Sequence, residues 1–197
     1  KAAAEIMTAG WRRAYRGRIA TARAGNVIGG GDYGEDRIVP DCIRALLAGT
    51  SIALRNPAAT RPWQHVLDCL SGYLWLGARL AEDDSFADAF NFGPNLEAQR
   101  SVGELVEEFL EHWPGEWTDA SNANAPHEAA TLSLSIDKAH QKLDWKPVWD
   151  FATAVQRTAR WYHQRHVVGS DDLHGLCLTQ LEAYTADAVD QSLAWSQ

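Results

Sequence analysis

Apolar residues recur along the chain at helical spacing, and short segments with the composition of strands separate them. Between positions 38 and 47 the apolar residues fall three or four apart, and Gly49 follows, which predicts a helix that ends there. Ser101 and Glu104 form a capping box ahead of the apolar positions of another helix. The same reasoning predicts further helices over 2–15, 65–80 and 136–143, from Asp150 onward, and beyond about Asp171.

Short strands are predicted between these helices. Residues 19–24 have the pattern of a buried strand, and shorter candidates lie at 51–54, 90–92 and 132–134. Strands that alternate with helices are typical of an α/β fold. No linker divides the chain clearly, so we expect residues 1–197 to belong to one structural unit.

Two segments carry the most chemical information. The strand over 19–24 leads through Asn26 into the glycine run 29–31, where the backbone can turn sharply and approach a ligand closely. Further along, Arg61 precedes Pro62, and we interpret this pair as a proline-fixed turn that opens a helix and holds a guanidinium for a diphosphate. Together the two segments predict a nucleotide-sugar pocket.

The charge balance limits the partners. The net charge is −8, with acids spread through the helices and no basic stripe, which argues against nucleic acid and against an anionic membrane surface. No apolar run reaches the roughly 20 residues that span a bilayer, and no signal-peptide pattern opens the chain. An anionic nucleotide sugar would therefore have to be met by a few local arginines.

The cysteines and histidines do not predict a metal site. Cys42, Cys69 and Cys177 lie far apart without C-x-x-C spacing, which argues against a zinc site or a disulfide framework and favours a reducing cytoplasm. His163 and His166 are one helical turn apart, but no acid is placed to complete a zinc site.

Several segments resemble the C-terminal half of the extended short-chain dehydrogenase/reductase family, which includes NAD-dependent epimerases and dehydratases. The matching segments are ARAGNVIGGGD (22–32), DRIVPDCIRALLAG (36–49), RNPAATRPWQHVLDCLSGYL (55–74), FNFGP (90–94), HEAATLSLSIDKAHQKLDWKP (127–147) and LTQLEAY (178–184). The segment that begins RNP and ends RPWQHV resembles the branch that acts on CDP-sugars, whereas NVIGGGD fits many relatives.

The resemblance implies an extended Rossmann-type fold, of which this chain supplies the last strands of the cofactor sheet and the small substrate-binding domain. It also implies NAD as cofactor, CDP-glucose or a similar nucleotide sugar as substrate, 4,6-dehydration as the reaction, and a homodimer. Residues 1–197 contain no G-x-G-x-x-G behind a strand and no counterpart of the family's catalytic tyrosine. We therefore expect the chain to be a fragment of a longer enzyme and inactive alone.

By this resemblance, Asn26 and Arg61 contact the substrate diphosphate. The planar fork of Arg61 suits bidentate phosphate contact, and the carboxamide of Asn26 can donate to a phosphate or sugar oxygen. From residue type alone, two structural alternatives stay open: Arg61 as a surface arginine stacked on Trp63, and Asn26 as a turn residue bound to its own backbone.

The resemblance extends to other positions. Lys1 matches the lysine that assists the catalytic tyrosine and binds the nicotinamide ribose, and Ala24 is expected to border the cofactor. Arg37 and Arg55 are expected to contact the substrate, Arg55 near the pyrimidine, although a plain surface arginine fits Arg55 equally well.

Asn91 and His127 match positions near the nucleotide ribose and phosphates, with a loop amide and a helix-capping imidazole as the structural alternatives. His65 begins a predicted helix, and we expect it to cap or pack rather than to catalyse.

Two other functions stay open at this point. One is a nucleotide-sugar 4-epimerase or another dehydratase of the same superfamily. The other is a nucleotide-sugar-binding module without chemistry.

Overall fold

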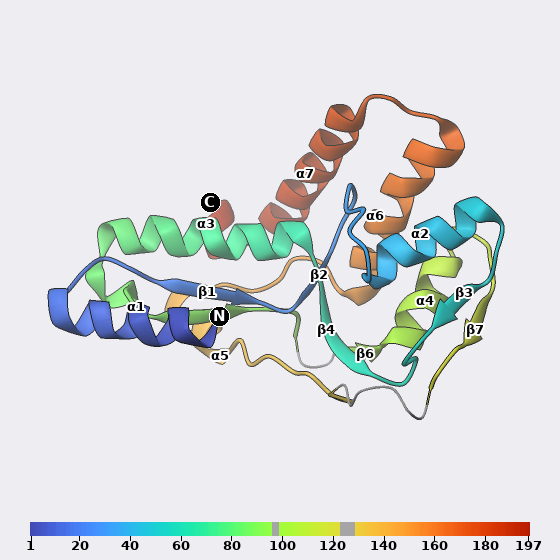
Figure 1. Cartoon of the computed structure of the whole chain (residues 1–197). Helices are drawn as coiled ribbons and strands as arrows, with labels where there is room; N and C mark the ends of the chain where they lie inside the picture. The colour runs from blue at the N-terminus through green and yellow to red at the C-terminus, as the bar shows by residue number, and fades with distance from the viewer. Residues whose placement is uncertain (96–98, 123–128) are drawn as a thin grey trace.

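Two short sheets meet at Gly25 in the computed structural model, which describes residues 1–95, 99–122 and 129–197 (Figure 1). In the first sheet, β1 (Thr21–Ala24) runs parallel to β5 (Ala89–Phe92). In the second, β4 (Thr60–His65) is parallel to β2 (Asn26–Ile28) and antiparallel to β6 (Gln99–Ser101). A separate pair is formed by β3 (Ile52–Leu54) and β7 (Trp117–Asp119), which are parallel. The chain thus leaves the first sheet and enters the second within one residue.

The carbonyl oxygen of Phe92 joins the two sheets. It accepts a hydrogen bond from the Gly25 N–H (3.2 Å) and another from Nε2 of the buried Gln64 (2.9 Å). A Cβ at position 25 would lie 2.5 Å from the carbonyl oxygen of Pro62, so only glycine fits where β1 passes β4.

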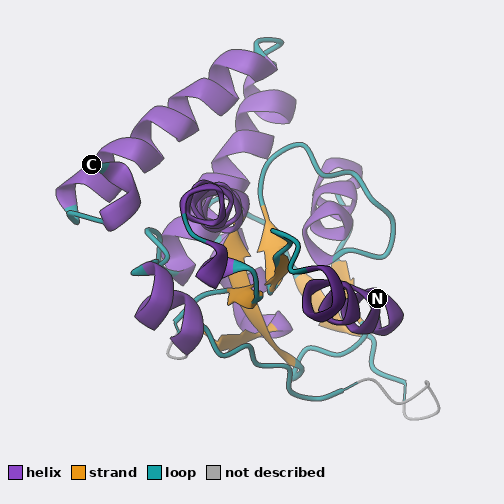
Figure 2. Ribbon diagram, turned by 90° about the vertical axis from the view of Figure 1, so that its left-hand side faces the viewer, coloured by secondary structure: helices purple, strands orange, loops and turns teal. Residues whose placement is uncertain are grey.

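Helices surround these strands (Figure 2). They are α1 (Ala2–Tyr15), α2 (Ile38–Ala48), α3 (Val66–Glu82), α4 (Val102–Leu110), α5 (Asp137–Leu143), α6 (Phe151–His163) and α7 (Leu173–Asp190), with short turns at Asp84–Phe86, Gln164–Val168 and Ala194–Ser196. The predicted capping box is present at the start of α4, and the Asp150 side chain caps α6. The helix predictions are confirmed because these signals are local.

Two hydrophobic clusters form most of the interior. One lies between β2, β4 and helices α2, α4 and α6, and it includes Ile43, Phe109 and Tyr162. The other packs Phe90 and Phe92 of β5 against α3 and α5. The cavity described below borders the first cluster.

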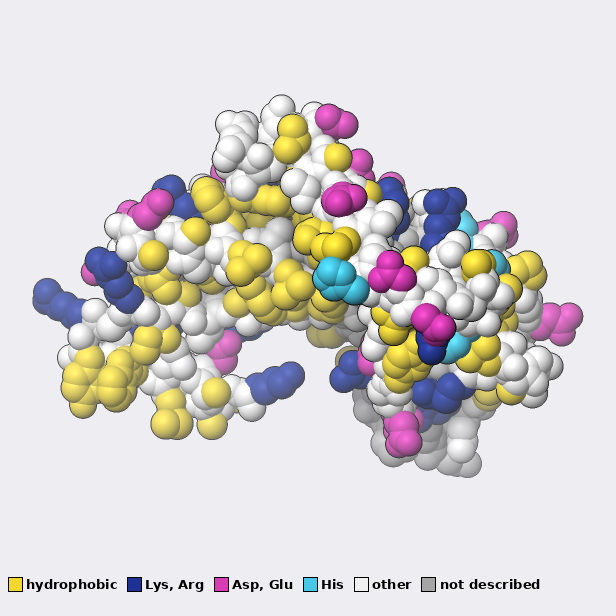
Figure 3. Space-filling view, turned by 90° about the horizontal axis from the view of Figure 1, so that it is seen from above, with side chains coloured by type: hydrophobic (Ala, Val, Ile, Leu, Met, Phe, Trp, Pro, Cys, Tyr) yellow, Lys and Arg dark blue, Asp and Glu magenta, His cyan; other side chains and the backbone are white. Residues whose placement is uncertain are grey.

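Helix α1 is packed differently, since none of its residues is buried. Met7 is 75% exposed and Trp11 is 52% exposed. Hydrophobic side chains are also visible on the face seen from above (Figure 3), and Leu70 and Leu74 of α3 are exposed. Among the described residues, no helix has the length and hydropathy needed to cross a bilayer.

Some sequence predictions about strands are wrong. Pro62 lies inside β4, in the half of the strand that pairs only with β6, and not in a turn. Proline is tolerated there because Pro62 itself is paired only with Gln99 of β6, and β2 joins β4 only from Trp63 onward. Residues 132–134 do not form a strand, although the adjacent Thr131 makes an isolated bridge to Thr60. Strand β4, with six residues, was not predicted, nor were β2, β6 and β7, each three residues long.

Candidate functional site

An open cavity of about 1130 Å³ lies where β2 and β4 meet the start of α2 and the end of β3. Four residues that the sequence singled out line it: Asn26, Arg37, Arg55 and Arg61. Asn26 begins β2 and stands opposite Trp63 of β4, so the parallel pairing places the two segments of the sequence argument on one wall. The fold thus gathers three guanidinium groups and a carboxamide around one space.

Arg61 is the most firmly held of the three arginines. Arg61 lies in β4 and is 8% exposed. Nη1 donates to the carbonyl oxygens of Thr60 (2.8 Å) and Ala129 (3.0 Å). These bonds fix the guanidinium with little freedom to lose on binding a ligand.

Arg37 and Arg55 are exposed, and each pairs with an aspartate. Arg37 Nη1 lies 2.9 Å from Asp32 Oδ2, and Arg55 Nη2 lies 3.1 Å from Asp36 Oδ1. Partial burial acts to raise the pKa of Asp32, but hydrogen bonds from the Gly34 N–H and from Arg37 lower that pKa below its ordinary value.

The cavity is therefore close to electrically balanced. Its charged lining residues are Asp32, Asp36, Asp41, Arg37, Arg55 and Arg61. Exposed ion pairs contribute only about 0–1 kcal/mol, so an entering phosphate can take an arginine from its aspartate at little cost. The aspartate partners were not predicted, because nothing in their spacing distinguishes them from the other acids of the chain.

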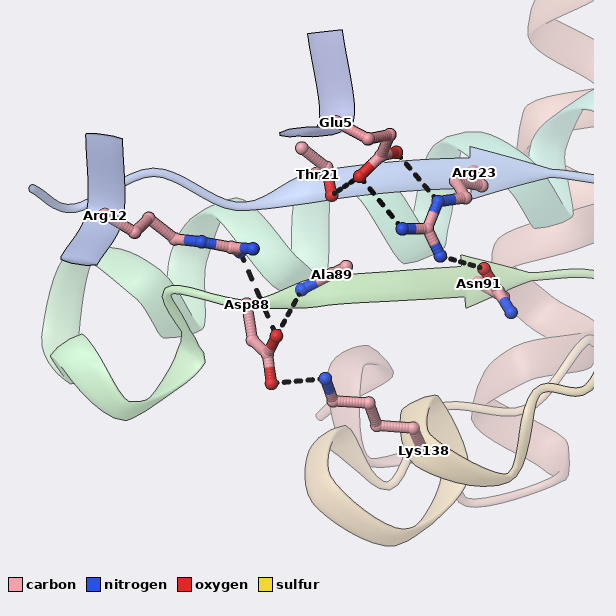
Figure 4. A network of polar contacts seen from close by, with 8 residues as sticks. All are labelled: Glu5, Arg12, Thr21, Arg23, Asp88, Ala89, Asn91 and Lys138. Atoms are coloured by element: carbon pink, nitrogen blue, oxygen red, sulfur yellow. Dashed lines mark hydrogen bonds and ion pairs between the residues drawn. The ribbon is translucent and has the colours of Figure 1, made fainter. Parts of the chain in front are cut away.

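Asn91 lies in a different network (Figure 4). Its Oδ1 accepts from Arg23 Nη1 (3.2 Å), and its Nδ2 donates to the carbonyl oxygen of Ser135 (3.0 Å). Arg23 also binds both carboxylate oxygens of Glu5, at 2.7 and 2.9 Å. The structure does not bring Asn91 into the lining of the cavity.

Of the remaining predicted residues, two lie apart from the cavity lining and one falls outside the described residues. Lys1 precedes α1 and is exposed, and Ala24 is the last residue of β1, paired with Phe92. His127 falls outside the described residues.

His65 caps α3, as expected, since its Nδ1 accepts from the Leu67 N–H. Burial, with a smaller contribution from the charge of Arg157, lowers the pKa of His65 to about 3, so the imidazole is neutral. Within the described part of the chain, no group of three His, Cys, Asp or Glu side chains is arranged to hold a metal ion.

Sequence comparison gives the family. Residues 1–93 match the model of the NAD dependent epimerase/dehydratase family. A CDP-glucose 4,6-dehydratase of Salmonella typhimurium is 40% identical over 160 residues, which cover 79% of this chain and 44% of the relative. The chain belongs to this family.

Other proteins are similar to this chain in sequence or in fold. A dTDP-glucose 4,6-dehydratase of Neisseria gonorrhoeae is 23% identical over 173 residues, 82% of this chain and 49% of its own. The dTDP-glucose 4,6-dehydratase of Streptomyces venezuelae, solved with NAD, superimposes with a TM-score of 0.72 at 21% identity, over 88% of this chain and 52% of that one.

A UDP-glucuronic acid 4-epimerase of Bacillus cereus gives a TM-score of 0.69 at 17% identity, over 81% of this chain and 50% of the epimerase. The chain spans about half the length of the family members it matches. The predicted α/β fold of the extended Rossmann type is confirmed.

Proposed function

We propose that this chain is the C-terminal portion of a nucleotide-sugar 4,6-dehydratase that converts CDP-glucose to CDP-4-keto-6-deoxyglucose. In this proposal the cavity holds the nucleotide diphosphate. The observation that supports it most is that Asn26 and three arginines from separate segments line one cavity. The similarity to a CDP-glucose 4,6-dehydratase at 40% identity supports the choice of cytidine. Homodimeric assembly and a cytoplasmic setting remain predictions.

The proposed reaction uses NAD, to which this chain contributes little. Ala24 offers a small side chain at the end of β1, and Lys1 offers an exposed ammonium group at the start of α1. Both fit the nicotinamide end of a dinucleotide, whereas residues 1–197 contain no glycine fingerprint for the pyrophosphate. When bound, NAD supplies the hydride acceptor for oxidation of the sugar.

In the same proposal, the protein's own groups bind and orient the substrate. Arg61 is pre-positioned by its two backbone carbonyl contacts, so it would fix the diphosphate, and Asn26 would donate to an adjacent oxygen. Arg37 and Arg55 would exchange Asp32 and Asp36 for phosphate or base oxygens. A nucleotide-sugar 4-epimerase is the second candidate. The described cavity residues would bind the nucleotide part of the substrate, which both enzymes would share, and such an epimerase has the same fold.

Replacing Arg61 by alanine should weaken the binding of CDP at least about tenfold, because hydrogen bonds to charged groups contribute roughly 1.5–3 kcal/mol. Isothermal titration of the protein with CDP, UDP and dTDP measures this, and CDP should bind most tightly. Arg165→Ala is the matched control, since Arg165 pairs with Asp171 and is not among the cavity-lining residues.

Arg61 is mostly buried, so Arg61→Lys is a second variant that keeps the charge and loses the planar fork. A folded Arg61→Ala protein that binds CDP within about twofold of wild type would contradict the assignment. Formation of a 4-keto product from CDP-glucose and NAD by the full-length protein, rather than a 4-epimer, separates the dehydratase from the epimerase.

A further inference from the structure

The loop between β2 and α2, residues 29–37, forms one wall of the cavity, and helix α6 lies behind it (Figure 1). Gly29, Asp32 and Arg37 line the cavity. Arg44 of α2 donates to the carbonyl oxygens of Tyr33 (3.4 Å) and Gly34 (3.3 Å) in this loop, and the other contacts of the loop include several from residues more than one hundred positions away. They are not explained by the roles considered so far.

The hydroxyl of Tyr162 is the central contact. It donates to the carbonyl oxygen of Asp32 at 2.6 Å and lies 3.3 Å from the carbonyl oxygen of Gly29. Both carbonyls are thereby held toward one point of α6, which closes the glycine turn. Burial raises the pKa of Tyr162, so the hydroxyl remains a donor across the neutral range.

The side chain of Trp161 fills the space beneath the glycine turn. A Cβ at Gly30 would lie 2.2 Å from the indole ring, and Gly31 has a φ of +83°, in the left-handed region. These two glycines are therefore needed for the indole and for the turn. The close approach that the glycine run predicted for a ligand is made at Gly30 by Trp161.

A third contact holds the loop beyond the turn. The hydroxyl of Tyr33 lies 3.1 Å from Nε2 of His166, and the Tyr33 ring meets Tyr162 edge to face with centroids 5.8 Å apart. His166 stacks against Tyr162 at 6.5 Å with an interplanar angle of 9°. Aromatic pairs of this kind stabilise a structure beyond the area that they bury.

Asp32 connects this support to the cavity. Its carbonyl oxygen is held by Tyr162, while its carboxylate accepts from the Gly34 N–H (3.0 Å) and from Arg37 Nη1 (2.9 Å). We propose that Trp161 and Tyr162 are positioning residues, which keep the 29–37 loop in the shape that presents Arg37 to the diphosphate of the nucleotide sugar. The identity of the ligand rests on the proposed function, whereas the ordering of the 29–37 loop by Trp161 and Tyr162 does not.

Tyr162→Phe removes only the hydroxyl and tests the proposal with two measurements. Amide hydrogen exchange of peptides covering 29–37 should be at least about fivefold faster in the unliganded variant, because opening the loop no longer breaks the bond to Asp32. The dissociation constant for CDP, from isothermal titration, should rise about five- to tenfold. In an Arg37→Ala background the same substitution should change that constant by less than twofold, since its effect passes through Arg37.

Tyr184→Phe is the matched control. The Tyr184 hydroxyl is also buried and hydrogen-bonded, to Asp68 and Ser71, but it touches neither the loop nor the cavity lining. It should lower stability and leave both loop exchange and CDP affinity unchanged. Tyr33→Phe, which removes the more exposed bond to His166, should act in the same direction as Tyr162→Phe with a smaller effect and serves if that variant does not fold.

Unchanged loop exchange in Tyr162→Phe would overturn the proposed ordering of the loop, whether or not CDP binds. Faster loop exchange with CDP affinity within twofold of wild type would overturn the link to Arg37. If the wild-type protein does not bind CDP, that result counts against the proposed function, and hydrogen exchange alone then decides whether α6 orders the loop.

Discussion

The interior behind the cavity and the layer formed by α1 on the first sheet are held together by different forces. Behind the cavity, side chains such as Trp161 and Tyr162 are almost completely buried. In the α1 layer no residue of the helix is buried, and its polar links to the sheet include the ion pairs of Glu5 with Arg23 and of Arg12 with Asp88 (Figure 4). Both helices looked equally regular in the sequence, so helical periodicity does not reveal how tightly a helix is packed.

The two kinds of contact respond to different conditions. Burial of apolar surface depends little on salt, whereas exposed ion pairs are screened within about 8–10 Å at physiological ionic strength. Substitutions in the two regions should therefore differ in size and in their dependence on salt and pH.

The largest difference is expected between two tryptophans. Trp161→Ala should lower the free energy of unfolding by about 3–5 kcal/mol, because it leaves a cavity against Gly30 in the main cluster. Trp11→Ala in α1 should change it by no more than about 0.5 kcal/mol, since Trp11 is half exposed. Urea unfolding followed by circular dichroism gives both values, and similar losses in the two variants would contradict the contrast.

An intermediate effect is expected at Asp68, a buried carboxyl group in the interior. Burial raises the pKa of Asp68 to about 7, against the lowering effect of hydrogen bonds from the Val148 N–H (2.7 Å) and the Tyr184 hydroxyl (2.9 Å). The folded state thus keeps a proton that the unfolded chain releases near pH 4. Stability from this group is present below about pH 4 and is lost as the pH rises to about 7.

The loss amounts to at most about 4 kcal/mol between these limits. Asp68→Asn should flatten this part of the pH dependence, and the flattening should persist at 1 M NaCl because the group is buried. Unfolding free energies of the two proteins at pH 4.5, 6 and 7.5 measure it. Parallel curves for wild type and variant would show that Asp68 does not titrate in this range.

The smallest effect, with the opposite pH dependence, is expected at Glu5 in the α1 layer. The hydrogen bond with Arg23 is the main reason that the pKa of Glu5 falls to about 2. Its stabilisation is present above about pH 4.5 and is lost as the pH falls toward 2. Glu5→Gln should lower Tm by on the order of 1 °C at low salt and by nothing measurable at 1 M NaCl.

Glu82→Gln, which removes the exposed pair with Arg79 within α3, is the matched control and should leave the attachment of α1 to the sheet unchanged. A Glu5 effect that survives high salt would mean that α1 is held by more than ion pairs.

Local signals in the sequence predicted the helices well. The bounds of α1, the capping box of α4 and the aspartate cap of α6 depend on residues within a few positions of one another. Of the missed strands, β2, β6 and β7 have three residues each, too few for a period of two to be recognised. The six-residue β4 was also missed, because it contains Pro62 and proline is typical of turns. Residues 132–134 show that period and still form no strand, because strand formation requires a partner that the local pattern does not specify.

The cavity was predicted in part. Asn26, Arg37, Arg55 and Arg61 were named from their resemblance to family positions, and the structure brings all four into one lining, while their roles remain predictions. The support from α6 was not predicted, since the bond between Tyr162 and Asp32 spans 130 positions. The glycine run was interpreted only as a place where a ligand approaches the backbone. The packing of Trp161 is instead what requires a glycine at position 30.

Gly25 connects the two sheets, and a glycine in such a place is often taken for a swivel. Here its N–H is bound to Phe92, the same oxygen also holds Gln64, and Pro62 leaves no room for a side chain. Rotation of one sheet against the other would break both hydrogen bonds and drive two backbones into collision. The angle between the strand end that carries Ala24 and the wall that carries Asn26 is thus built in, and any opening for substrate entry has to come from elsewhere.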